Sequence, residues 1–104
     1  MKIYIDATFD KHTHVAFIGY CNPLLTITNV KKIKASDINQ AEMSALCLAV
    51  RNLGVDNEFL TDSMSVVNQC ECENVSHVSR SMNIADSVVA ISKESNLNNI
   101  RNKL

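Results

Sequence analysis

The chain of 104 residues is 46% hydrophobic and 20% charged, which is typical of one globular domain spanning residues 1–104. Its longest apolar runs, such as residues 45–50, are far too short to cross a bilayer, and acidic residues within the first ten positions disfavour a signal peptide, so we expect a cytoplasmic protein with no membrane partner. The formal net charge of −1 disfavours nucleic-acid binding by electrostatics alone, so any such role must rest on a local patch or on metal ions and should be weak.

The first third of the chain has the pattern of three strands. Residues 2–7 alternate between core and surface types and are rich in β-branched side chains, and residues 14–21 and 24–33 follow the same pattern. Asn22-Pro23 is a turn signal between the second and third of these segments. Because the links are short, we expect an antiparallel meander.

The apolar spacing then changes to a helical period over residues 35–53, where Ala45, Ala49 and Leu53 recur at steps of four and Gly54 follows as a stop signal. Strand and helix patterns alternate afterwards: strand 57–61, helix 63–70, strand 74–79, helix 83–92, and a short helix or polar tail over residues 91–104. The order βββαβαβα predicts an α/β fold with a mixed sheet and helices packed on it.

Four acidic residues occupy positions where the apolar pattern expects a core. Asp6 shares a strand face with Tyr4, and Glu42 lies on the apolar stripe of its helix. Asp62 ends a strand, and Asp86 stands between apolar residues of the last helix. Each acid alone also has a local explanation: Asp6 opens a turn, Glu42 closes a capping box with Asn39, Asp62 caps the next helix, and Asp86 follows an Asn83 cap.

The four acids together point to a metal site. A mixed sheet places the ends of the first and fourth strands side by side, and carboxylates gathered there repel one another unless cations neutralise them. Oxygen ligands without His or Cys suit Mg²⁺ or Mn²⁺. Two such ions can clamp the attacking and leaving oxygens of a phosphodiester.

Four segments resemble the motifs of ribonuclease H type 1, in the family's order and over roughly residues 3–90. They are YIDATF around Asp6, NQAEMSAL around Glu42, LTDSMSVV around Asp62 and HVSRSMNIAD ending at Asp86. The last is similar to a motif of plant, archaeal and retroelement members. The resemblance implies a five-stranded mixed sheet in the order 3-2-1-4-5 with helices on both faces, and hydrolysis of the RNA strand of RNA–DNA hybrids with two Mg²⁺ or Mn²⁺ ions.

The resemblance also implies a role for each matched residue. Asp6 bridges both ions, Glu42 and Asp62 hold the ion on the leaving-group side, and Asp86 holds the ion that activates water. His77 assists product release. The remaining matched positions are expected to contact substrate: Ala7, Thr8, Asn39, Ser63, Arg80 and Asn83.

The chain departs from the family pattern at several positions. Ala7 stands where a Gly is usual in a turn after the first aspartate, and Ser79 stands where a Pro is common. The interval from Asn83 to Asp86 is one residue shorter than usual. A basic handle helix is absent, and only the trio Lys31, Lys32 and Lys34 stands in for it, either as a phosphate track or as a solvated strand end.

The remaining side chains that can bind metals fit ordinary positions. The Cys-Glu-Cys at positions 70–72 has neither zinc nor redox spacing, so we expect reduced thiols, and His12 and His14 fit a hairpin. Two other functions stay open. One is a catalytically weak or inactive ribonuclease H-like module that binds nucleic acid or protein, and the other is a DNA nuclease or integrase of the same fold. A separate module that supplies nucleic-acid affinity is a further expected partner.

Overall fold

Strands and helices follow the predicted order βββαβαβα in the structure, a computed structural model that describes residues 1–70 and 74–93. The elements are β1 (Lys2–Asp10), β2 (Val15–Cys21), β3 (Thr28–Lys34), α1 (Ile38–Leu53), β4 (Glu58–Thr61), α2 (Met64–Gln69), β5 (Val75–His77), the 3-10 turn η1 (Arg80–Met82) and a helix over residues 85–93. Most of the short helix or tail expected over residues 91–104 lies outside the described residues.

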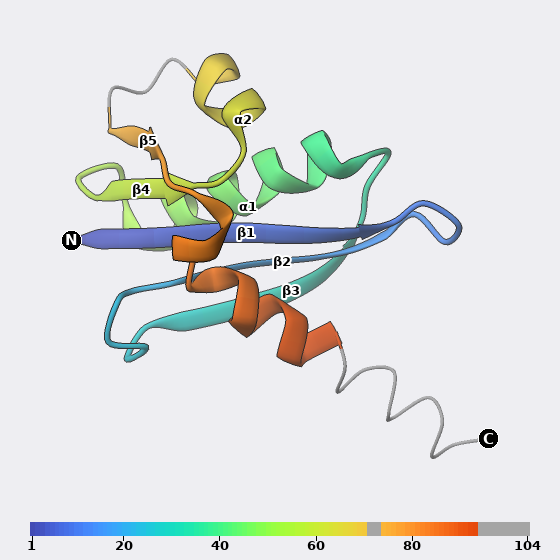
Figure 1. Ribbon diagram of the computed structural model, residues 1–104, viewed down its shortest axis with the longest axis horizontal. Coiled ribbons are helices and arrows are strands. Elements are labelled where there is room, and N and C mark those ends of the chain that lie inside the picture. Colours follow the sequence, from blue (N-terminus) through green and yellow to red (C-terminus); the bar gives the residue numbers. More distant parts are fainter. Residues whose placement is uncertain (71–73, 94–104) are drawn as a thin grey trace.

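The five strands form one mixed sheet in the order β3-β2-β1-β4-β5 (Figure 1). β1 pairs with β2 and β2 with β3 in antiparallel fashion, whereas β1–β4 and β4–β5 are parallel. Tyr4 of β1 lies opposite Leu60 of β4. Asp6 and Asp62 each follow this pair by two residues, so the parallel register brings both acids to the same level of the sheet.

Several element boundaries differ from the predicted ones for local reasons. β1 continues past Asp6 to Asp10, so the expected turn after Asp6 is wrong. The third strand begins at Thr28 because the Asn22 side chain organises the preceding turn. Its Oδ1 accepts from the Ile27 N–H at 2.9 Å and its Nδ2 donates to Thr26 Oγ1 at 2.8 Å. Leu24, expected in the strand, is instead 80% exposed in this turn.

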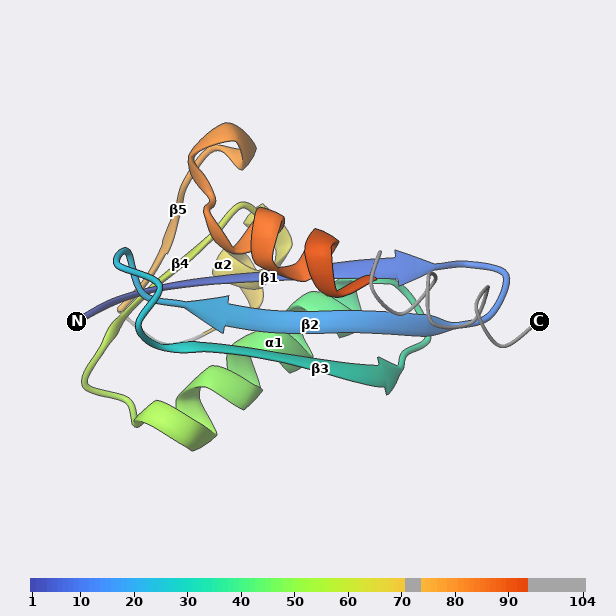
Figure 2. The ribbon, with the colours of Figure 1, turned by 90° about the horizontal axis from the view of Figure 1, so that it is seen from below.

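Helices cover both faces of the sheet, as expected. The main core lies between α1 and one face, where Ile3, Ile5 and Ala7 of β1 pack in one cluster with Ala45 and Ala49 of α1. In Figure 2 the strands β1 to β3 lie between α1, behind them, and the helix of residues 85–93, in front. Strand alternation turns Asp6 away from Ile5 and Ala7, toward the face that this last helix covers.

Gly19 allows the last helix to approach the sheet closely. It lies opposite Asp6 in β2, and a Cβ atom added there would come within 2.9 Å of the Asn29 carbonyl oxygen and 3.0 Å of a Val89 methyl. Val89 itself is fully buried. The missing side chain at position 19 therefore lets Val89 seat against the strand, which fixes how far the N-terminus of this helix lies from β1.

The cysteines of the described residues differ in their exposure. Cys21 is buried and Cys47 exposed, both as thiols, and burial raises the pKa of the Cys21 thiol to about 11. Cys72 lies outside the described residues. No helix in residues 1–70 and 74–93 combines the length and apolar character needed to cross a membrane.

Candidate metal centre

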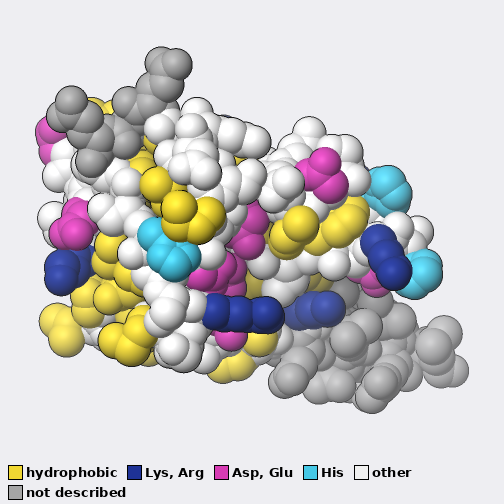
Figure 3. Space-filling view, turned by 45° about the horizontal axis from the view of Figure 1, so that its top comes forward, with side chains coloured by type: hydrophobic (Ala, Val, Ile, Leu, Met, Phe, Trp, Pro, Cys, Tyr) yellow, Lys and Arg dark blue, Asp and Glu magenta, His cyan; other side chains and the backbone are white. Residues whose placement is uncertain are grey.

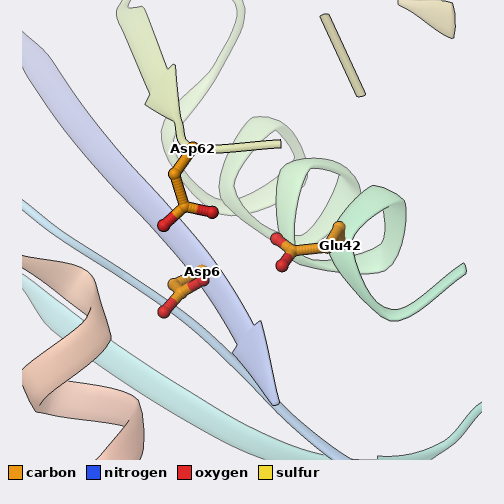
Figure 4. Close-up of side chains that lie close together, drawn as sticks. All are labelled: Asp6, Glu42 and Asp62. Atoms are coloured by element: carbon orange, nitrogen blue, oxygen red, sulfur yellow. The ribbon is translucent and has the colours of Figure 1, made fainter. Parts of the chain in front are cut away.

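Three acidic side chains converge from three different elements. Asp6 lies midway along β1, Glu42 on the second turn of α1, and Asp62 directly after β4. One carboxylate oxygen of each lies within 4.8 Å of one from the other two. Figure 4 shows these side chains pointing toward one another. The expected cluster of Asp6, Glu42 and Asp62 is therefore present.

Neither Glu42 nor Asp62 serves as a helix cap, so the two capping explanations are wrong. Asp37 caps α1 by accepting from the Gln40 N–H at 2.8 Å, and Gln40 Oε1 accepts in return from the Ser36 N–H. Ser63 caps α2 through its side chain, which accepts from the Val66 N–H at 3.3 Å. The local structure is satisfied without Glu42 and Asp62, so another reason must account for their positions.

Burial makes these acids costly in the absence of a cation. Asp6 is only 4% exposed and Glu42 only 6%. The buried Oε2 atom of Glu42 has no hydrogen-bond partner among the residues that the structure describes. A buried carboxylate oxygen without a donor costs on the order of 1–3 kcal/mol, or more when it is charged. An unpartnered oxygen beside two other carboxylates is what a site for a positive ligand requires.

The pKa values of Asp6 and Glu42 are both raised, mainly by burial. Burial raises the pKa of Asp6 to about 7; the Ala7 backbone hydrogen bond opposes this rise, and the charges of Asp62 and Asp86 add to it. Burial also raises the pKa of Glu42 to about 8, the charges of Asp6 and Asp62 raise it further, and the Arg80 guanidinium counteracts them. Without a cation the cluster therefore holds protons near neutral pH that an ordinary carboxylate would lose.

Asp86 is the fourth acid of the same cavity. It is half-buried near the start of the helix of residues 85–93, and its carboxyl group lies within hydrogen-bonding reach of the Asp6 carboxyl. The expected Asn83 cap is confirmed, because Asn83 Oδ1 accepts from the Ala85 N–H at 3.1 Å. This cap starts the helix so that Asp86 faces Asp6, even with the shortened interval from Asn83.

An open cavity of about 380 Å³ is lined by all four acids. Figure 3 shows acidic side chains gathered on this face with basic side chains directly beside them. The described residues that line the cavity are Asp6, Ala7, Thr8, Phe9, Ile38, Glu42, Asp62, Arg80, Asp86 and Lys93. Of the residues expected to contact substrate, Ala7, Thr8 and Arg80 therefore lie at the cavity wall. Phe9, Ile38 and Lys93 were not anticipated.

Four other expected site residues do not themselves form the cavity wall, although Asn83 bonds to Asp62, which does. Asn39 is exposed on the first turn of α1, and His77 is exposed on β5 opposite Thr61. Ser63 is occupied as a helix cap, and Asn83 is buried and bonded within the protein. None of the four is among the described cavity-lining residues, so their contacts with substrate stay predictions.

The lysine trio divides between two faces of the sheet. Lys31 lies opposite Ile18, whose side chain belongs to the α1-facing core, whereas Lys32 points to the other face by strand alternation. Lys31 and Lys34 line a second cavity together with Arg51, on the far flank of α1 from Glu42. The three lysines do not form one continuous track beside the carboxylates.

The donor set fits a hard cation. Asp6, Glu42 and Asp62 offer oxygen ligands alone, close enough to share one ion, and Asp86 adds a further carboxylate beside Asp6. These residues can hold a metal ion. No protein-family model matches the chain, and no curated protein matches it either.

Proposed function

We propose that this protein is a metal-dependent endoribonuclease that hydrolyses the RNA strand of RNA–DNA hybrids. One observation carries the proposal: four carboxylates from four parts of the fold meet in one open cavity, just beyond the point where the parallel pairing of β1 and β4 ends. The four residues are those at the ribonuclease H motif positions, and the strand order is the one that the motifs imply. Motifs and geometry thus support the same activity from independent directions.

Mg²⁺ or Mn²⁺ ions are the proposed cofactors, two for each site. Asp6 is central because it neighbours both the Glu42–Asp62 pair and Asp86, so it is the ligand that both ions would share. Glu42 and Asp62 would hold the ion on the leaving-group side, and Asp86 the ion on the side of the attacking water. When bound, the ions supply Lewis-acid stabilisation of the phosphodiester and lower the pKa of the attacking water.

The protein's own residues position the reacting groups. Asn83 donates to Asp62 and thereby orients that carboxylate. Arg80 lines the cavity and places a guanidinium near Glu42, where it can also bind a phosphate oxygen of the substrate. Thr8 and Ala7 form the wall along which a nucleic-acid strand would lie.

Composition favours weak binding by the isolated domain. Ten basic residues stand against eleven acidic ones, and three of the basic residues line the second cavity, away from the carboxylates. We therefore propose that a separate module supplies part of the affinity for the hybrid. We also propose that the protein acts in the cytoplasm, as the sequence predicts.

A cleavage assay tests the function. A labelled RNA–DNA hybrid is incubated with Mg²⁺ or Mn²⁺ and compared with RNA–RNA and DNA–DNA duplexes of the same sequence. We expect cleavage of the RNA strand in the hybrid alone, its loss in Asp62→Asn, and its retention in Asp56→Asn, a matched change at an exposed acid in the preceding loop. Absence of hybrid cleavage by the wild type with both metals would reject the proposal.

A further inference from the structure

The cavity that holds the carboxylates continues along β1. Its wall runs from Asp6 through Ala7 and Thr8 to Phe9, and Lys93 lines it from the last helix. Three residues of a strand span about 10 Å. Lys93 also lies near Asp10, at the end of β1, where it adds to the lowering of the Asp10 pKa that the His12 backbone N–H mainly causes. The cavity is therefore a trough that leads from the Asp6 carboxylate along β1 toward Lys93.

The helix of residues 85–93 forms the wall opposite β1. It carries its charged side chains in the same order, with Asp86 near its start and Lys93 at residue 93. Asp86 and Lys93 are seven residues apart, nearly two full turns, so they lie on the same side of the helix and about 10 Å apart along its axis. Val89, between them, is buried against Gly19 and fixes the rotation of the helix. Figure 2 shows this helix running beside β1 in the same direction.

The length and charge of the trough suit a nucleic-acid strand. Each strand carries one phosphate per about 3.4 Å of helix axis, and successive phosphates are farther apart along the backbone itself, so 10 Å of strand corresponds to about one or two phosphates. Lys93 is attached about 10 Å along the helix from Asp86, so its ammonium group can neutralise a phosphate further along a strand whose scissile bond lies at Asp6. Lysine binds phosphate in this way as a flexible point charge.

We propose that Lys93 binds a phosphate of the strand that is cleaved, about one or two nucleotides from the scissile bond. This inference rests on the proposed function and extends it, because it assigns the path of the substrate strand along β1 and the last helix. Arg80 near Glu42 and Lys93 near Asp10 then hold the strand on either side of the carboxylates.

Binding measurements test the inference without relying on turnover. In an Asp62→Asn background, anisotropy of a labelled hybrid is followed over a range of salt concentrations in Mg²⁺. We expect Lys93→Gln to weaken binding by about three- to tenfold and to reduce the slope of log affinity against log salt by about one. Lys93→Arg should preserve binding. Lys2→Gln is the matched control, because it removes the same charge at the other end of β1.

Kinetics supply a second measurement in the active protein. Because Lys93 is remote from the reacting atoms, Lys93→Gln should raise KM by a similar factor and leave kcat within about twofold. Melting curves of each variant establish that the fold is kept.

Two results would overturn the inference. In one, Lys93→Gln binds hybrid with the same affinity and salt slope as Lys2→Gln. In the other, the double variant Lys93→Gln/Asp10→Asn regains full affinity, which shows that Lys93 acts only by neutralising Asp10. The proposed function fails separately, when the wild type cleaves no hybrid, and a wild type that also binds no hybrid would reject both.

Discussion

Asn83 donates a hydrogen bond of 3.1 Å from its Nδ2 to the Asp62 carboxylate, across 21 positions of sequence. The same nitrogen donates to the Ile5 carbonyl at 2.9 Å, and the Asn83 Oδ1 accepts from Ala85 N–H. One buried amide therefore ties together β1, the segment after β4 and the start of the last helix. These are the elements that carry Asp6, Asp62 and Asp86.

Asn83→Ala should cost stability and activity together. It leaves the Ile5 carbonyl and the Ala85 N–H without this partner, at about 1–3 kcal/mol for each buried group, so we expect a loss of about 2–6 kcal/mol in the free energy of unfolding. The Asp62 carboxylate also loses its donor, so cleavage should fall at least tenfold. Denaturant unfolding and the cleavage assay measure the two effects.

Asn39→Ala is the matched control, because Asn39 is exposed on the first turn of α1. We expect no change in its unfolding beyond about 0.5 kcal/mol. If Asn39 contacts substrate as its motif position implies, KM rises in this variant. The role assigned to Asn83 would be contradicted if Asn83→Ala unfolded like the wild type.

Asp62→Asn should abolish cleavage while raising the stability of the metal-free protein. The charge of Asp62 raises the pKa of both Asp6 and Glu42, so removing it relieves repulsion that exists only in the folded state. Asn can still accept the hydrogen bond from Asn83. Mg²⁺ should reverse the comparison, because a ligand that binds the native state stabilises it by mass action and the wild type binds it better.

Melting temperatures in chelator and in Mg²⁺ distinguish the outcomes for Asp62→Asn. We expect the variant to melt above the wild type in chelator and the wild type to gain more from Mg²⁺. A variant that melts lower in chelator, together with no Mg²⁺ effect on either protein, would mean that the acids form no metal site.

The metal-free wild type should lose stability as pH rises from about 5 to 8. The pKa values of Asp6 and Glu42 are raised by burial to about 7 and 8, so between these values and the unfolded values near 4 the native state binds more protons than the unfolded chain. Stability then falls with pH, and the slope ends above about pH 8. Saturating Mg²⁺ should flatten the profile, because metal ligands must be deprotonated.

Glu42→Gln is the variant that checks this pH dependence. It removes the group with the higher pKa, so the loss of stability between pH 7 and 8 should shrink. Melting temperature against pH in chelator is the measurement. A flat wild-type profile, or a Glu42→Gln profile as steep as that of the wild type, would show that the two acids are not protonated in this range.

The order of strands and helices was predictable because the apolar period changes clearly from two to a helical spacing near residue 35. The boundaries were less predictable where a polar side chain overrides the pattern. Leu24 belongs to an alternating apolar segment, yet Asn22 closes a turn around it and delays β3 to Thr28. The turn expected after Asp6 was wrong because Ala7 continues the pairing of β1, opposite Ile18.

The four carboxylates were predictable because acids within apolar stripes must lie near a core. The sequence could not show whether the side chain of a motif residue faces the cavity or makes a hydrogen bond within the protein, because this depends on the tertiary fold. Asn83 turns inward to Asp62, and Ser63 is used as a cap. Lys93 was not predicted as a site residue because the predicted helix ended at residue 92. Its distance of seven residues from Asp86 was nevertheless visible in the sequence.

His77→Ala should slow turnover without abolishing it. His77 is exposed at the end of β5, one strand beyond the one that leads to Asp62, so an effect on product release rather than on metal binding is expected. We expect kcat to fall up to about a hundredfold with the Mg²⁺ effect on melting unchanged. Ser76→Ala, at the exposed neighbouring position, is the control. If His77→Ala matches it from pH 6 to 9, Arg80 becomes the next candidate for this role.

Gly19→Ala should displace the helix that carries Asp86. The new Cβ would meet the Asn29 carbonyl oxygen at 2.9 Å, which is backbone and cannot rotate away, and the Val89 methyl at 3.0 Å. Overpacking of this kind costs about 1–3 kcal/mol. The contact with Asn29 is relieved only by a local shift of β3, whereas the contact with Val89 is relieved by a shift of the last helix away from the sheet. Asp86 then moves away from Asp6, so we expect both a lower melting temperature in chelator and a smaller Mg²⁺-dependent gain.

Gly54→Ala is the control variant that separates the loss of stability from the loss of Mg²⁺ binding. Gly54 ends α1 at φ 86° with open space around it, so an alanine there strains the backbone by about 1 kcal/mol but leaves the last helix in place. Gly54→Ala should therefore melt lower yet keep the full Mg²⁺ gain, and an equal Mg²⁺ gain in both variants would mean that Gly19 does not position Asp86.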